Sequence, residues 1–135
     1  MTKGESKMES FTKSVNSLDE VILAYNKEDN KQTKVFLRDS AIQRFEICFD
    51  LAWKTLKEYL LEKKGISCFS PKVCFREAFQ NNFFHSDDGR WMQMTDDRNL
   101  MTHIYNEDEA EKIFQKMPEY LVLFKELLEE VKKQK

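Results

Sequence analysis

The stretch 33-TKVFLRDSAIQRFEICFDLAWKTLKEYLLEKKG-65 decides the fold, because it is the longest segment with one helical pattern. Apolar residues recur along it at steps of three and four, which is the spacing of one helix face. Gly65 follows two lysines and is a natural C-terminal stop. We therefore predict a helix from about Thr33 to Lys64, about 45–50 Å long at 1.5 Å per residue. The apolar stripe consists of Ile42, Phe45, Phe49, Ala52, Trp53, Leu56 and Leu60.

The apolar sector of this helix is wider than one bundle core requires. Ala41, Ile47, Cys48 and Leu51 all lie outside the stripe. Interfaces between chains have apolar centres, so part of the surface of residues 41–60 is predicted to contact a second copy. The sequence thus favours a homodimer.

Shorter helices are predicted on both sides of the long one. Residues 1–10 are expected to be a flexible N-terminus, and residues 26–32 form a loop. Ser70 and Pro71 read as the N-cap and first residue of a helix that ends near Gln80. The stripe that precedes the loop consists of Phe11, Val15, Leu18, Ile22 and Tyr25.

The C-terminal part continues the helical pattern. Residues 81–89 are predicted to form a turn with an exposed aromatic pair, and Asp87 or Asp88 can cap the helix that carries Trp91, Met94 and Met101. Asn106 and Glu109 resemble a capping box that starts the last helix, which Pro118 should kink or split. The predicted fold is all-α: an up-and-down antiparallel bundle of four to five helices, with residues 11–135 as a single domain.

Composition narrows the classes of function. The 135 residues contain only 3 Gly and 2 Pro, which argues against a many-stranded sandwich or barrel. The net charge is −2, so the chain lacks the excess of Lys and Arg that is typical of a dedicated nucleic-acid binder. The sequence contains no run of 18 apolar residues, so it predicts no membrane span. The N-terminus lacks the apolar core of a signal peptide. We therefore expect a cytoplasmic protein, and we expect it to have no cofactor.

The three cysteines, Cys48, Cys68 and Cys74, have apolar neighbours and form no C-x-x-C pair. This pattern predicts small buried thiols in a reducing cytosol. A zinc site from Cys68, Cys74 and His85 is an alternative, but its spacing matches no standard zinc pattern. We therefore assign no metal ligands.

The segment 98-RNLMTHIYNEDE-109 carries the residues best suited to chemistry. On a straight helix Asn99 and His103 would share a face, while Arg98, Thr102 and Tyr105 would share another. Arg98 and His103 could then meet only in a cleft that wraps the helix, or where the helix bends. Such a cleft could form between two chains.

This set could cleave RNA. The 2′-hydroxyl of RNA can attack its own neighbouring phosphorus, so the reaction needs no metal. His103 could transfer the proton near neutral pH, and Arg98 could bind the phosphate. Asn99 could hold either the histidine or the phosphate, with Thr102 and Tyr105 at the rim.

Six acidic residues between positions 96 and 111 would repel RNA unless cations such as Arg38, Arg44 or Lys54 offset them. A structural histidine and a surface arginine are the simpler alternative.

The motif Arg98-Asn99-x3-His103-x-Tyr105 resembles that of HEPN domains. The phrases 44-RFEICFDLAWKTLKEYL-60, 70-SPKVCFREAF-79 and 98-RNLMTHIYNE-107 resemble one branch, the nucleotidyltransferase substrate-binding proteins, which is similar to the HepT toxins of MntA–HepT toxin–antitoxin pairs. The resemblance implies a homodimeric bundle with Arg98, Asn99 and His103 as catalytic residues at the dimer seam. It also implies a small MntA-like nucleotidyltransferase partner that silences a metal-independent ribonuclease by adenylylating Tyr105.

Two other functions stay open. The chain could be a non-catalytic subunit that binds nucleotide or substrate for a two-component nucleotidyltransferase, as the name of the branch suggests. It could also be a purely structural bundle, which would explain the aromatic stripes without any site.

Overall fold

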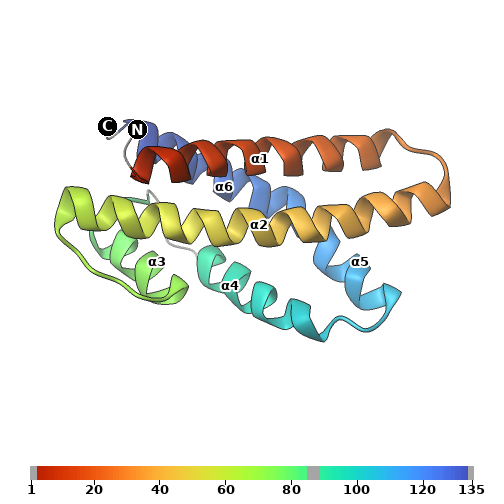
Figure 1. The fold of residues 1–135 in the computed structure, drawn as a ribbon. Helices are drawn as coiled ribbons and strands as arrows, with labels where there is room; N and C mark the ends of the chain where they lie inside the picture. Colours follow the sequence, from red (N-terminus) through yellow and green to blue (C-terminus); the bar gives the residue numbers. More distant parts are fainter. Residues whose placement is uncertain (1–2, 85–88, 134–135) are drawn as a thin grey trace.

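The computed structural model describes residues 3–84 and 89–133, and all regular elements among them are helices. Figure 1 shows two long antiparallel helices, with shorter helices packed along them. The predicted all-α bundle is therefore confirmed. The elements are α1 (Lys3–Lys27), α2 (Lys31–Lys64), α3 (Pro71–Gln80), α4 (Arg90–Leu100), the 3-10 helix η1 (Met101–His103), α5 (Glu107–Gln115) and α6 (Met117–Lys133).

The long helix α2 begins and ends where its capping residues predict. The side chain of Asn30 accepts a hydrogen bond from the Thr33 N–H at 2.9 Å, which satisfies a free donor of the first turn. Gly65 adopts a left-handed conformation with φ of 68°, and the backbone N–H of Ile66 bonds back to the Leu60 carbonyl. The predicted span from Thr33 to Lys64 is thus confirmed to within two residues.

Helix α1 begins at Lys3, earlier than Phe11, where the apolar stripe starts. Lys7 pairs with Glu58 of α2 at 2.7 Å, and Thr12 bonds to the Met8 carbonyl. The chain before Phe11 is therefore helical without an apolar stripe, and the ion pair of Lys7 joins it to the neighbouring helix.

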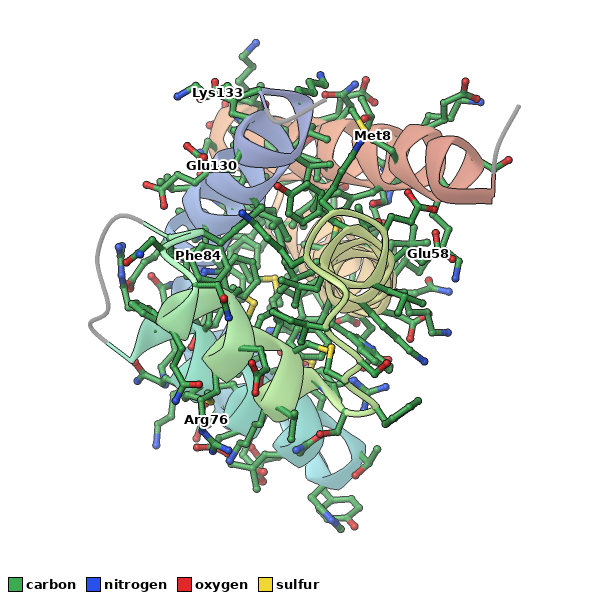
Figure 2. All side chains as sticks on the ribbon, turned by 90° about the vertical axis from the view of Figure 1, so that its left-hand side faces the viewer. Met8, Glu58, Arg76, Phe84, Glu130 and Lys133 are labelled. Atoms are coloured by element: carbon green, nitrogen blue, oxygen red, sulfur yellow. A yellow bond between two sulfur atoms is a disulfide. The ribbon has the colours of Figure 1, made fainter. Side chains whose placement is uncertain are left out.

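The core lies where α1, α2 and α6 meet. Phe45 of α2 packs against Tyr120 and Phe124 of α6, with ring centroids 5.6 and 5.7 Å apart. Phe11 of α1 contacts Phe124 edge to face at 6.2 Å. Figure 2 looks almost along α2, which lies at the centre with side chains packed around it.

The last predicted helix is split in two, giving six α-helices in the described residues instead of the four or five expected. Pro118 lies at the second position of α6, and α5 ends at Gln115, because proline cannot donate within a continuous helix. Asn106 caps α5 through the Glu109 N–H, and its amide also donates to the Glu109 carboxylate, as the predicted capping pair requires.

The turn after α3 differs from its predicted form. Phe83, which the sequence pattern places in an exposed aromatic pair, is buried against Tyr59 with ring centroids 5.1 Å apart, because α2 extends beneath this turn. Asp87 and Asp88 lie outside the described residues, and the N-cap position of α4 belongs to Gly89.

The expectation of three thiols is wrong for two of the cysteines. Cys68 and Cys74 form a disulfide between the loop after Gly65 and the first turn of α3, with Cα atoms 5.3 Å apart. Their sulfurs are therefore not free for the zinc site considered above, and its third member, His85, lies outside the described residues. Cys48 is a buried free thiol as expected, and burial raises its pKa to about 11.

None of the described helices combines the length and the apolar character needed to cross a membrane.

We predict that alkylation of the unfolded, unreduced protein labels Cys48 alone, and that prior reduction exposes three thiols. Intact-mass spectrometry counts the labels. The Cys68→Ser variant is the control, because it should show two free thiols without reduction. Three labels on the unreduced parent protein would contradict the disulfide.

Candidate active site

The motif residues lie where α4 ends, and the chain bends there instead of continuing as one straight helix. Helix α4 stops at Leu100, η1 covers Met101–His103, and Ile104 is extended. Asn106 must also be extended to cap α5 with its side chain. Tyr105 therefore leaves the helical path, and the angles expected for a straight helix do not apply. The extended residues come after His103, so this bend changes the position of Tyr105 and does not bring Arg98 toward His103.

A buried carboxylate fixes the end of α4. Asp97 is 8% exposed and accepts hydrogen bonds from the Tyr120 hydroxyl and, at 3.2 Å, from the Lys116 ammonium group. Burial, followed by the bond to Asp97, raises the pKa of Tyr120 well above its usual range. Tyr120 is therefore a neutral donor, and the contact joins α4 to α6 one residue before Arg98.

The anchoring role of Asp97 is missing from the sequence-based expectations, which treat it only as one of six acids. The sequence nevertheless indicates that Asp97 is buried. Asp97 is three residues after Met94 and four before Met101, so it lies on the apolar stripe of α4. A charged residue within a buried stripe requires a partner.

His103 and Tyr105 are brought together on the outside of the bend. The His103 Nδ1 and the Tyr105 hydroxyl are 3.3 Å apart, and Tyr105 is 79% exposed. The Thr102 hydroxyl bonds to the Asn99 carbonyl at 3.4 Å, so it serves the local turn. Asn99 is exposed and Arg98 half-buried.

Within the described part of the chain, no hydrogen bond or ion pair joins Arg98 to His103. The side chain of Arg98 makes no such contact with any described residue, so its charge is free for an anionic ligand. No described group of three or more His, Cys, Asp or Glu side chains is arranged to hold a metal ion.

The acidic charge around the motif is largely paired. Arg38, 6% exposed on α2, pairs with Glu107 at 3.2 Å and with Glu111 at 3.6 Å. Asp96 pairs with Lys72 at 2.6 Å, and Asp97 is held by its contacts to α6. Arg38 also pairs with Asp39 at 3.1 Å, so its single positive charge offsets only part of the acidic charge beside the motif. The other two suggested cations are also engaged, since Lys54 pairs with Asp50 and Arg44 bonds to Ser17.

Comparison with known proteins supports the resemblance. Residues 6–133 match the family model described as nucleotidyltransferase substrate binding protein like. A probable ribonuclease HepT of Haemophilus influenzae is 27% identical over 96 residues, which are 68% of this chain and 65% of that protein. The chain thus aligns with just under two thirds of this relative's length.

Two solved structures share the fold. A protein from Thermus thermophilus has a TM-score of 0.78 and 35% identity, covering 90% of this chain and 98% of its own. A Haemophilus influenzae protein described as having the fold of a substrate binding domain of a nucleotidyltransferase has a TM-score of 0.81 and 22% identity, covering 93% and 98%.

We predict that Asp97→Ala lowers the free energy of unfolding by about 1–3 kcal/mol, because it leaves the buried Tyr120 hydroxyl without an acceptor. Urea unfolding measures the change. Asp96→Ala is the matched control and should cost less than about 1 kcal/mol, because its ion pair with Lys72 is exposed. Equal losses in the two variants would contradict the anchoring role of Asp97.

Proposed function

Because the chain belongs to the nucleotidyltransferase-substrate-binding-protein-like family, we propose that it is a HEPN-type toxin, a metal-independent RNA endonuclease paired with a small MntA-like nucleotidyltransferase antitoxin. The observation that carries the proposal is the placement of the His103 Nδ1 3.3 Å from the Tyr105 hydroxyl, on an exposed segment close in sequence to Arg98, which forms no ion pair with any described residue. The similarity to a probable ribonuclease supports the same assignment.

The proposed reaction is an internal transesterification. The RNA 2′-oxygen forms a bond to the adjacent phosphorus, the bond to the 5′-oxygen breaks, and a cyclic phosphate results. His103 takes the proton from the 2′-hydroxyl or gives one to the leaving oxygen. Arg98 binds the phosphate oxygens on which charge develops, and Asn99 donates to the same group. No metal or cofactor has a step in this scheme.

The site needs a second copy of the chain, because one copy leaves it open. Leu100 and Tyr105 beside the motif are 61% and 79% exposed. On α2, Ala41 and Cys48 are buried within the chain, but Ile47 is 48% exposed and Leu51 is half-buried. Ile47 and Leu51 give the apolar surface on which we place the homodimer contact. Two copies would then contribute two copies of Arg98 to one cleft.

Regulation would act through Tyr105. The phenol oxygen of Tyr105 forms a bond to the α-phosphorus of ATP on the partner transferase, and pyrophosphate leaves as its bond breaks. The added phosphate competes for Arg98, while the nucleoside fills the space that RNA would occupy. Both RNA and ATP would be met in the cytoplasm, where we place the protein.

The alternative is a non-catalytic subunit that binds nucleotide or substrate for a two-component nucleotidyltransferase. The description of the family favours it. Cleavage of RNA by the purified protein separates the two functions.

We predict that His103→Ala slows RNA cleavage in EDTA by about 10²–10⁴-fold, because it removes the acid–base group. Gel analysis of a labelled RNA measures the rate, and circular dichroism checks that the variant is folded. His85→Ala is the matched control and should cleave like the parent. A folded His103→Ala variant that cleaves at the parent rate would refute the assignment.

We predict that co-expression with the partner transferase adds one or more AMP groups to the chain, and that Tyr105→Phe abolishes the addition, because it lacks the acceptor oxygen. Intact-mass and peptide mass spectrometry locate the modification. Tyr25→Phe is the control and should be modified like the parent. An AMP group mapped to another residue, or no addition by an active transferase, would refute this step.

We predict a dimer of twice 16.2 kDa in light scattering at micromolar concentration. Ile47→Asp should shift it to the monomer, because a carboxylate would be buried in an apolar contact. Val122→Asp, which alters a side chain of similar exposure on α6, should stay dimeric. A monomeric parent protein would contradict the dimer.

A further inference from the structure

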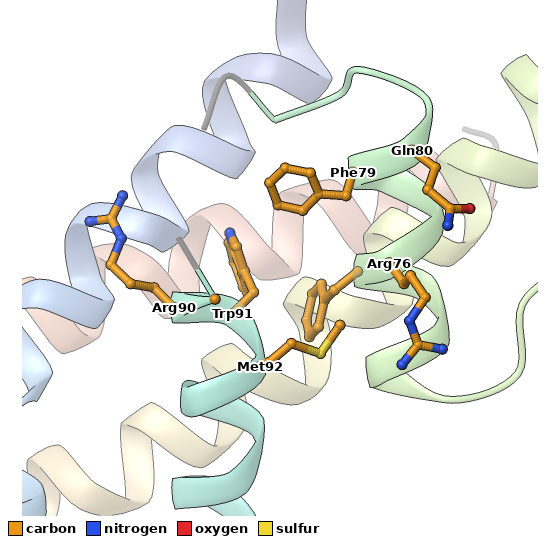
Figure 3. A pocket seen from close by; sticks show the side chains of 8 residues that line it. Arg76, Phe79, Gln80, Arg90, Trp91 and Met92 are labelled. Carbon is orange, nitrogen blue, oxygen red and sulfur yellow. The ribbon is translucent and has the colours of Figure 1, made fainter. Parts of the chain in front are cut away.

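A pocket of about 510 Å³ lies between α3 and α4, at the end of α4 opposite the motif. Figure 3 shows that α3 contributes Phe79 and Arg76, while α4 contributes Arg90, Trp91 and Met92. This volume is within the usual range for sites that bind small molecules, about 300–1,000 Å³. The lining residues are Phe75, Arg76, Phe79, Gln80, Gly89, Arg90, Trp91 and Met92.

The floor of the pocket is apolar and held in place by ring contacts. The Trp91 ring packs against Phe75 at 4.6 Å and stacks on Phe84 at 5.4 Å, so Trp91 is only 6% exposed. Phe79 and Met92 are half-buried and supply the apolar surface that a ligand could contact. A planar ring could pack on this surface without rearrangement of the floor.

The charged residues of the pocket are of one sign. Two arginines and the Gln80 amide line it, and no acidic side chain is among the lining residues that the structure describes, although the whole chain has a net charge of −2. Figure 3 places Arg76 and Arg90 on different sides of the aromatic floor. Arg76 is exposed and forms no ion pair with any described residue, so its guanidinium group can fork onto a phosphate.

From this combination we infer that the pocket binds a nucleoside phosphate. The base packs against Phe79 and Met92, the phosphate binds Arg76, and Gln80 supplies hydrogen bonds. The inference goes beyond the proposed ribonuclease, because neither RNA cleavage at His103 nor modification of Tyr105 uses this pocket, and it gives the alternative function a specific nucleotide site. It assigns a second site to the other end of α4.

Calorimetric titration of the purified full chain with AMP in EDTA tests the site directly. Arg76→Ala should weaken AMP binding about tenfold or more, because it removes the phosphate contact. Phe79→Leu should weaken it as well, because it removes the ring that the base contacts while preserving most of the packing. Lys13→Ala, which removes one positive charge from an exposed position on α1, should bind AMP like the parent.

Three further titrations test whether AMP binds at the pocket or at the motif, and whether both its base and its phosphate are needed. Arg98→Ala should bind AMP far more tightly than Arg76→Ala does, and adenosine or inorganic phosphate alone should bind more weakly than AMP. Absence of AMP binding at millimolar concentration would overturn the inference. So would equal binding by Arg76→Ala, or loss of binding in Arg98→Ala, which would place the nucleotide at the motif. The RNA-cleavage assay tests the ribonuclease proposal separately, so failure of either proposal does not decide the other.

Discussion

The carboxylate of Asp97 joins the motif to the bundle, and the geometry of the proposed site depends on it. Its partners are Lys116, the residue between α5 and α6, and Tyr120 in the first turn of α6. Pro118 causes the break between these two helices, so Pro118 and Asp97 together determine how α6 packs beside the end of α4. A continuous last helix would follow a different path past the end of α4.

A second ionic contact holds the other end of the motif. Glu107 begins α5 and pairs with the buried Arg38 of the long helix α2. The segment between Asp97 and Glu107 is thus fixed at both ends, while Asn99, His103 and Tyr105 are exposed. Rigid attachment with exposed functional groups suits a site that must accept a large substrate. The same contacts offset part of the acidic charge that would repel a phosphate backbone.

The sequence predicts the regular parts of this fold well, because helical period and capping are local properties. The span of α2, the stop at Gly65, the Asn106 cap and the break at Pro118 all follow from neighbouring residues. The burial of Phe83 could not be predicted, since it depends on how the chain after α3 folds back onto α2. The pairing of Cys68 with Cys74 was missed because it depends on how the loop after Gly65 turns into α3. The motif could be identified, but not its bend, because the Asn106 cap ends the helical geometry that spacing assumes. Asp97 was visible in the stripe of α4, although its partners become evident only in three dimensions.

The central claim is that this chain cleaves RNA by attack of the substrate's own 2′-hydroxyl, with His103 as the proton-transfer group. The most direct measurement uses an RNA oligonucleotide with one mapped cleavage site and a matched oligonucleotide that lacks only the 2′-hydroxyl there. Both are incubated with the purified protein in EDTA. The account predicts that the first is cut to a 2′,3′-cyclic phosphate and a 5′-hydroxyl, and that the second stays intact at that position. Cleavage of both oligonucleotides at the same rate would contradict it, as would an intact first oligonucleotide.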